Sequence, residues 1–246
     1  MQLNKYQILV CDPPYSFNDS LSMSQVKRSA ESNYSTMTIE AIKSLPIKDI
    51  SDPDGCLLAL WVPSSMIQSG LDIMTSWGFS QKQTYIWAKT KKEPLDFLRK
   101  GISGLLKQPE ISYDKFAYDR IIRSIARAVE NITLNAKENI LSFGMGRLFR
   151  NSHELALIGI NNNGVYKNLV NKSQRSLSFA PNFKHSQKPE ALQDSLDTMF
   201  NVPNKLELFA RRQRDGWMCI GNQSPITEKE DIKESLLKLI QNDTIT

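Results

Sequence analysis

Short apolar runs recur along the whole chain, separated by polar stretches, and they predict strands that alternate with helices. Most of these runs are rich in β-branched or aromatic residues, which is typical of buried strands. Seven predicted strands cover residues 6–11, 56–62, 83–89, 155–160, 178–181, 205–212 and 216–223. An alternation of this kind indicates an α/β domain.

The helices are predicted from apolar residues at helical spacing and from the residues at their ends. Four of them cover residues 38–45, 65–77, 190–200 and 227–242. Thr38 is a favourable N-cap, and Pro46 ends the first helix because it lacks a backbone N–H. Gly78 follows the second helix as a C-cap. The last helix is amphipathic, and both packing on the core and docking on a partner stay open for it.

Composition and charge narrow the class of protein. The 246 residues, 40% of them hydrophobic, suffice for one large α/β domain with an inserted subdomain. A net charge of +5 and an isoelectric point near 9.0 are compatible with a polyanionic partner. The chain has no apolar leader and no apolar run of about 18 residues, so we expect neither a signal peptide nor a membrane span.

The three cysteines are Cys11, Cys56 and Cys219, and each lies in an apolar run without paired spacing. We therefore interpret them as core residues in a reducing compartment, and not as zinc ligands or disulfides.

The stretch Asp12-Pro13-Pro14-Tyr15 directly follows the first predicted strand. Neither proline has an N–H and both fix φ, so the strand must end here in a stiff turn. Pro14 also holds Pro13 in an extended conformation. In open α/β sheets ligands bind at the carboxyl ends of strands, which is where this turn lies.

These four residues suit the chemistry of a flat heterocycle with an exocyclic amine. The Asp12 carboxylate and the Pro13 carbonyl can accept the two amine hydrogens and draw the nitrogen lone pair out of conjugation with the ring. Tyr15 can stack on the ring, an interaction worth about 1–3 kcal/mol per base. An electrophilic methyl group, such as that of a sulfonium, then completes the transfer.

The motif resembles the catalytic motif of S-adenosylmethionine-dependent methyltransferases that act on the amino groups of adenine or cytosine. The rest of the chain is similar to the MT-A type family, that of the messenger-RNA adenosine methyltransferase, in its phage and bacterial DNA-adenine methylase branch. The further matching stretches are Tyr34-Ser35-Thr36-Met37, Trp87-Ala88-Lys89-Thr90, Arg150-Asn151-Ser152-His153-Glu154, His185-Ser186-Gln187-Lys188-Pro189, Glu207-Leu208-Phe209-Ala210-Arg211 and Gly221-Asn222-Gln223.

The resemblance implies a doubly wound, Rossmann-like methyltransferase sheet that is circularly permuted, with the catalytic strand first and the cofactor strand last. It also implies a methyltransferase domain over residues 1–226 and a C-terminal helix over residues 227–246. The link from residue 91 to residue 143 is longer than in the family, so we interpret it as a helical insertion.

The resemblance further assigns roles to residues. The catalytic residues would be Asp12, Pro13, Pro14 and Tyr15. The cofactor, S-adenosylmethionine, would be bound by Cys11, Asp12, Lys89, His185, Ser186, Lys188, Glu207, Phe209, Arg211, Asn222 and Gln223. The substrate would be bound by Tyr34, Arg150, Asn151, His153 and Glu154. No metal is implied.

The expected activity is methylation of adenine N6 in DNA, with the target base flipped out of the duplex. The RNA-modifying relatives more often carry Trp at the position of Tyr15, which favours DNA. RNA adenosine methylation, cytosine N4 methylation and an inactive nucleic-acid-binding subunit stay open. A dinucleotide-dependent oxidoreductase is disfavoured because no G-x-G-x-x-G follows a strand.

The context of the protein stays open as well. The family carries further cofactor contacts upstream of the motif, but only eleven residues precede Asp12 here. We therefore expect neighbouring segments or a partner subunit to supply those contacts. The partner could be a second copy of the chain in a homodimer. We expect a cytoplasmic protein if the source is bacterial or a phage, and a nuclear one if it is eukaryotic.

The predicted insertion has two chemically different sides. Arg120, Arg123 and Arg127 gather on one side, away from a stripe of apolar residues. The arginine side could follow a phosphate backbone or could simply be a solvated face.

Overall fold

The computed structural model describes most of the chain. The described residues are 5–16, 36–94, 96, 99–100, 103, 115–134, 138, 140–144, 148–182 and 187–245. Tyr34, His185 and Ser186, three of the predicted site residues, lie outside these ranges.

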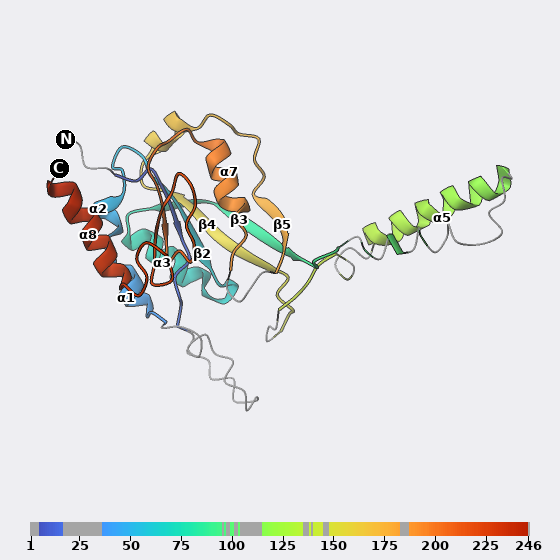
Figure 1. Cartoon of the computed structure of the whole chain (residues 1–246), viewed down its shortest axis with the longest axis horizontal. Coiled ribbons are helices and arrows are strands. Elements are labelled where there is room, and N and C mark those ends of the chain that lie inside the picture. The colour runs from blue at the N-terminus through green and yellow to red at the C-terminus, as the bar shows by residue number, and fades with distance from the viewer. Residues whose placement is uncertain are drawn as a thin grey trace, which may run out of the picture. The chain divides into compact units, whose positions relative to one another are not determined.

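Seven strands and several helices alternate along the described residues (Figure 1). The strands are β1 (Ile8–Cys11), β2 (Leu57–Val62), β3 (Ser80–Thr90), β4 (His153–Ile160), β5 (Leu177–Pro181), β6 (Lys205–Leu208) and β7 (Met218–Ile220). The α-helices are α1 (Ile39–Lys43), α2 (Ile47–Ile50), α3 (Ile67–Ser76), α5 (Lys115–Leu134), α7 (Ala191–Met199) and α8 (Ile232–Ile245). The described residues also contain two 3-10 helices, η2 (Ser64–Met66) and η3 (Asn163–Asn168).

The strands form one sheet in the order β5-β3-β4-β2-β1-β6-β7. β1 pairs in parallel with β2 and β6, and β6 pairs in parallel with β7. β4 is antiparallel to β2. The first strand of the chain thus lies beside one of the last, with Cys11 level with Leu208. This arrangement confirms the Rossmann-like α/β fold, and each of the seven predicted strands is present.

Helices cover both faces of β1 and β2, and every residue of these two strands is buried. Alternate strand residues share one hydrophobic cluster with α1, α2, α3 and α8; they include Leu9, Cys11, Leu58 and Leu60. The residues between them are equally buried on the other face; they include Ile8, Val10, Ala59 and Trp61. Glu207 of β6 is level with Val10 and is bonded by Gln193 of α7, which places α7 over that second face.

The Cα positions divide the chain into two compact units. The first holds residues 1–86, 155–176 and 190–246, and with them the buried parallel strands. The second holds residues 87–154 and 177–189, which include the predicted insertion and the strand ends that flank it.

Two predicted helix caps are confirmed, whereas the last helix begins at Ile232 and not at residue 227. The Thr38 side chain accepts a hydrogen bond from the Ala41 N–H at 3.2 Å, as an N-cap should. Gly78 has φ +82°, a conformation that favours glycine, directly after α3. α8 contributes Ile232 and Leu236 to the core cluster. The C-terminal helix therefore packs on the core, which is one of the two interpretations that the sequence left open. α1 ends at Lys43, earlier than the predicted stop at Pro46, and α2, which was not predicted, begins directly after that proline.

Two predicted strands end earlier than expected, which corrects their bounds. β6 ends at Leu208, because Phe209 has φ +60° and cannot continue a strand. β7 ends at Ile220, and a turn follows.

All three cysteines are free and buried, as predicted for core residues. Within the described ranges, no helix combines the length and the apolar character that a membrane crossing requires.

Candidate active site

The proline motif forms a tight turn directly after β1. The Pro13 carbonyl accepts the Tyr15 N–H at 2.9 Å, and the Pro14 carbonyl accepts the Met37 N–H at 2.7 Å. The Ser16 N–H donates to the Met37 carbonyl at 3.1 Å. Pro13 is buried, whereas Asp12 is partly exposed. The bond from the Tyr15 N–H fixes the direction of the Pro13 carbonyl, and a carbonyl oxygen has a second lone pair that can accept another donor.

Tyr15 anchors this turn to the neighbouring strand. Its ring is 4% exposed and belongs to the core cluster, and its hydroxyl donates to the Trp61 carbonyl at 2.9 Å. Burial raises the pKa of Tyr15 well above its ordinary value, so the hydroxyl stays protonated at neutral pH. Stacking of this ring on a base stays a prediction.

Removing the Tyr15 hydroxyl therefore costs stability. We expect Tyr15→Phe to lower the free energy of unfolding by about 1 kcal/mol, the net worth of one buried hydrogen bond. Urea denaturation of the two proteins measures this difference. Equal unfolding free energies would contradict the role of the Tyr15–Trp61 bond.

A second acidic residue lies at the end of the neighbouring strand. Glu207 of β6 is partly buried, and the Gln193 Nε2 donates to its Oε2 at 3.1 Å. Burial raises the pKa of Glu207; the Gln193 bond and Arg212 offset this in part, and the negative charge of Asp12 raises it further. Asp12 and Glu207 thus lie close enough at the carboxyl ends of β1 and β6 to influence each other.

Gln193 is a site residue that the sequence analysis missed. It is 2% exposed, and among the described residues its Oε1 has no hydrogen-bond partner. A buried acceptor without a donor is rare in folded proteins and is costly unless a ligand or water supplies the donor. No sequence signal marks it, because a glutamine in a helix is ordinarily exposed.

The turns after β6 and β7 approach each other closely. The Ala210 N–H donates to the Ile220 carbonyl at 2.9 Å. A Cβ on Gly221 would lie 2.7 Å from the Ala210 carbonyl oxygen and 2.9 Å from the Phe209 carbonyl carbon. Phe209, which has a left-handed backbone conformation, lies where these two turns approach each other. Residues in such strained conformations are often found at functional sites.

The close approach of the turns after β6 and β7 brings together several predicted cofactor residues in the first unit. Arg211, Asn222 and Gln223 are exposed on the two turns, beside the ends of β6 and β7. Thr227 fixes the second turn through hydrogen bonds of 2.9 Å with the backbone of Gly221. The amide side chains are thereby presented on a rigid backbone.

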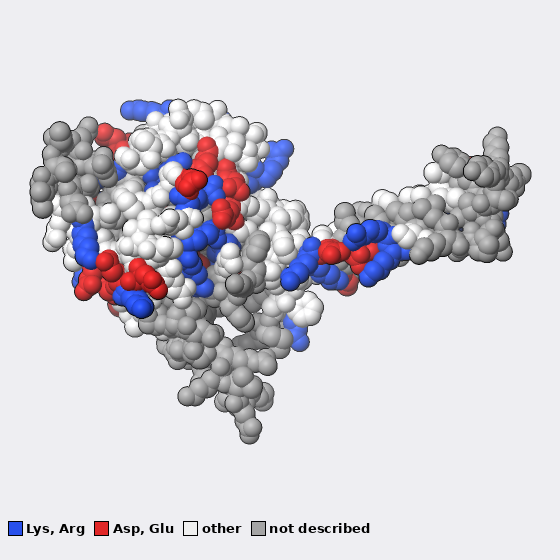
Figure 2. Space-filling model, in the orientation of Figure 1, with Lys and Arg blue, Asp and Glu red and all other residues white. Residues whose placement is uncertain are grey.

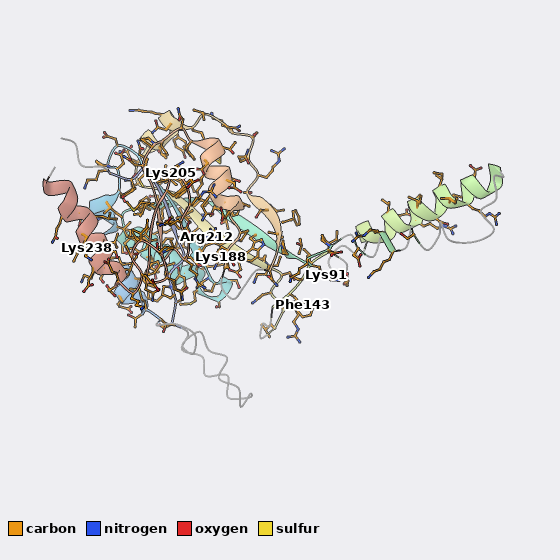
Figure 3. All side chains as sticks on the ribbon, viewed as in Figure 1. Lys91, Phe143, Lys188, Lys205, Arg212 and Lys238 are labelled. Atoms are coloured by element: carbon orange, nitrogen blue, oxygen red, sulfur yellow. The ribbon has the colours of Figure 1, made fainter. Side chains whose placement is uncertain are left out.

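A network of ion pairs ties α7 to the turn between β6 and β7. Arg214 contacts Glu190, Asp194 and Asp197 at 2.6, 2.7 and 2.7 Å. Lys205 contacts Asp197 at 2.6 Å, and Arg212 contacts Glu190 at 2.8 Å. Acidic and basic surfaces lie side by side in the region of α7 in Figure 2, and Figure 3 labels Lys205 and Arg212.

The same network places Gln193 over Glu207, because both ends of α7 are held by it. The sequence carries one signal for the network, because the acidic residues at positions 190, 194 and 197 share one helix face. Their partners are Lys205 of β6 and Arg212 and Arg214 of the following turn, and this pairing could not be known without the topology.

The network predicts a pH-dependent stability. Burial by itself would raise the pKa of Asp197, but hydrogen bonds from Lys205, Arg214 and Trp217 outweigh it and lower the pKa. A lowered pKa means that Asp197 stabilises the fold above its ordinary value of 3.8 and loses this effect as the pH falls through the lower folded value.

We therefore expect Asp197→Asn to lower the unfolding free energy by about 1–3 kcal/mol at pH 7. The difference from the wild type should shrink as the pH falls below 3.8. Denaturation at several pH values measures this. A difference that persists at pH values well below that point would show that Asp197 acts through something other than its charge.

The second unit contains a separate cluster of predicted site residues. The Lys89 Nζ lies 2.6 Å from Glu154 Oε1, and the Lys188 Nζ lies 3.1 Å from Glu154 Oε2. Burial alone would raise the pKa of Glu154, but the Lys188 and Lys89 ammonium groups outweigh it, so that the pKa is lowered. Lys89 also lies 5.3 Å from the centre of the Trp87 ring. Two predicted cofactor residues and one predicted substrate residue thus meet.

The other predicted substrate residues of this unit are exposed. Arg150, Asn151 and His153 lie at or just before the start of β4. Arg150 lies 6.0 Å from the centre of the Phe143 ring. The backbone of Asn151 pairs with that of Gly144 at 2.8 and 3.1 Å, which holds the segment before the strand. No cluster of three His, Cys, Asp or Glu side chains suited to a metal ion occurs in the ranges described above.

Comparison with known proteins places this geometry in context. The MT-A70 family model matches residues 6–110 and 123–223. The type II methyltransferase M.MunI of Mycoplasma sp is 23% identical over 240 residues, which are 90% of this chain and 78% of that protein.

Two plant proteins are also similar. A probable N(6)-adenosine-methyltransferase MT-A70-like of Oryza sativa subsp. japonica and an N(6)-adenosine-methyltransferase MT-A70-like of Arabidopsis thaliana are each 24% identical over 224 residues. These alignments cover 90% of this chain but only 23% and 24% of the plant proteins. The chain therefore spans about a quarter of their length.

Proposed function

Because the chain belongs to the MT-A70 family and is a methyltransferase of that family, we propose that it transfers a methyl group from S-adenosylmethionine to N6 of adenine in DNA. The observation that carries the proposal is the turn after β1. It holds the Asp12 carboxylate and the Pro13 carbonyl on a backbone fixed by three hydrogen bonds.

Asp12 and Pro13 bind and activate the amine in this proposal. Each supplies one acceptor for the two N6 hydrogens, which localises the lone pair on nitrogen. The transfer forms a nitrogen–carbon bond and breaks the sulfur–methyl bond, and one amine proton leaves to solvent. Since hydrogen bonding supplies the activation, the carboxylate need not be a strong base. When bound, the cofactor supplies the electrophilic methyl group.

The residues at the ends of β6 and β7 fit a nucleoside with a cationic centre. Glu207 and the amides of Asn222 and Gln223 are suited to ribose hydroxyls and adenine edges. The Oε1 of Gln193, which has no hydrogen-bond partner within the described ranges, is suited to a further donor. The carboxylates of Asp12 and Glu207 create a negative potential that favours a sulfonium. Arg211 and Phe209 complete this part of the proposal.

Lys89 and Lys188 keep their proposed role of binding the carboxylate of the cofactor. Their shared partner, Glu154, holds both ammonium groups in place. Arg150, Asn151, His153 and Glu154 keep their proposed role on the substrate side. These assignments rest on the matching motifs of the family.

DNA is favoured over RNA by the motif, which ends in Tyr15 where the RNA-modifying relatives more often carry Trp. RNA adenosine methylation is the second candidate, because the plant proteins that are 24% identical to this chain are named as N(6)-adenosine-methyltransferases.

Labelled S-adenosylmethionine distinguishes these candidates. We expect the protein to transfer label to unmethylated duplex DNA and far less to an RNA of the same base sequence. Label that accumulates only in the RNA would replace the proposal with the second candidate. No transfer to either nucleic acid would contradict both.

A further inference from the structure

Helix α5 has two chemically different sides and lies outside the site described above. It is 20 residues long and belongs to the second unit. With 3.6 residues per turn, Arg120, Arg123 and Arg127 fall within about 60° of one another around the helix axis. The apolar residues lie on the opposite half of the helix; they are Ile121, Ile122, Ile125 and Val129.

The three arginines, which we call the arginine face, are all exposed. Among the described residues, no hydrogen bond, ion pair or ring contact involves any of them. Other arginines of the same structure are engaged: Arg99 bonds Glu93 and Asp96, and Arg214 contacts three carboxylates.

Acidic residues of the helix do not neutralise the arginine face. Asp119 and Glu130 stand four and three residues from Arg123 and Arg127, a spacing that permits ion pairs on a helix. Within the described part of the chain neither acid pairs with an arginine. The guanidinium groups are thus available to an external anion.

The net charge of residues 91–143 also favours an anionic partner. Residues 91–143 contain ten Lys or Arg and seven Asp or Glu, a net charge of +3 in a chain whose total is +5. Most of the excess positive charge therefore belongs to a fifth of the chain. An anionic partner with many closely spaced charges suits such a surface better than a single small anion.

A phosphate backbone fits the spacing of the arginine face. From Arg120 to Arg127 the helix rises about 10 Å, at 1.5 Å per residue. Duplex DNA carries one negative charge per about 1.7 Å of its axis, so several phosphates lie along that length. The planar guanidinium group also matches two oxygens of one phosphate, which an ammonium group does not.

We propose that the arginine face of α5 binds the phosphate backbone of duplex DNA. The inference rests on the proposed function for its choice of DNA as the polyanion. Contacts of this kind supply affinity and orientation and carry no base specificity. Each phosphate contact releases condensed cations, so its signature is a dependence of binding on salt.

The test measures that dependence. The triple variant Arg120→Gln, Arg123→Gln, Arg127→Gln keeps good helix formers at all three positions. Fluorescence anisotropy with a labelled duplex, at several salt concentrations, gives the slope of log K against log salt. We expect the slope to fall in magnitude by about 2.7, which is 0.9 for each of three lost contacts, and the affinity at 0.1 M salt to fall at least tenfold.

Two control proteins separate this effect from others. Lys43→Gln, Lys82→Gln, Lys233→Gln removes the same charge from exposed positions of the first unit, and we expect its slope to stay within about one unit of the wild type. The triple Arg→Lys variant keeps the charge of α5, and we expect it to retain most of the slope.

Several outcomes would overturn the proposal. They are an unchanged slope in the Gln triple variant, an equal loss in the lysine control, and an equal loss in the Arg→Lys variant, which would indicate a damaged helix. An unchanged slope would leave an acidic protein surface as the alternative partner. Methyl transfer by the wild-type protein is measured separately, so a failure of the proposed function is distinguishable from a failure of this inference.

Discussion

Replacing Asp12 by Ala is expected to lower the rate of methyl transfer to DNA by about 10²- to 10³-fold. This is within the range of rate losses typical when a side chain that acts on a reacting proton or amine is removed. The physical reason is the loss of one of two acceptors for the amine hydrogens, which leaves the nitrogen lone pair conjugated with the base. Asp12→Asn keeps one acceptor oxygen without the charge, and an intermediate rate is expected. Single-turnover assays at saturating cofactor measure these rates.

The matched control is Asp49→Ala, which removes an exposed carboxylate from α2. It should retain the wild-type rate. If Asp12→Ala and Asp49→Ala both transferred methyl groups at the wild-type rate, the role of the Asp12 carboxylate would have to be abandoned.

Replacing Glu207 by Gln is expected to weaken cofactor binding by about 10- to 100-fold, because hydrogen bonds to a charged acceptor are worth about 1.5–3 kcal/mol. Isothermal titration calorimetry with S-adenosylmethionine measures this. Since burial raises the pKa of Glu207, wild-type affinity should also decline as the pH falls toward that raised value, at a higher pH than the ordinary 4.5. The Glu207→Gln protein should lack this decline.

The same substitution should act on stability with the opposite sign. A carboxyl group whose pKa is raised in the folded state favours unfolding at neutral pH, and this effect declines as the pH falls from the raised value to the ordinary 4.5. Glu207→Gln should therefore match or exceed the wild-type stability at pH 7. A variant that loses stability and affinity together would point to a structural role for Glu207.

Gln193→Leu provides a check on the arrangement around Glu207. It leaves the carboxylate in place but removes its amide donor and the unpaired Oε1. We expect a smaller loss of cofactor affinity than in Glu207→Gln, because the charged acceptor is retained.

The features that were predictable from the sequence are those set by local chemistry. Apolar runs of strand length identified all seven strands, and Thr38 and Gly78 marked helix ends through a cap and a left-handed conformation. The order of the motifs also indicated that the strand with Asp12 would lie beside the strand with Glu207, as the register of β1 and β6 shows.

The features that were missed depend on contacts between distant segments. The apolar pattern of residues 205–212 continues past Leu208, but the strand ends there. The turn at Gly221 approaches the chain at this point, where Phe209 has a left-handed conformation. Gln193 and the carboxylates that contact Arg214 belong to a helix whose neighbours are known only once the strands are ordered. The burial of Tyr15 was missed for the same reason, because its hydrogen bond to Trp61 joins residues that are 46 positions apart.

The most direct test of the account is the identity of the methylated nucleoside. Unmethylated duplex DNA is incubated with labelled S-adenosylmethionine and the protein, digested to nucleosides and separated by liquid chromatography with mass spectrometry. The account predicts label in N6-methyldeoxyadenosine with the wild-type protein and a loss of at least about 100-fold with Asp12→Ala. Label in N4-methyldeoxycytidine, or label in N6-methyldeoxyadenosine that persists undiminished in the Asp12→Ala protein, would contradict it.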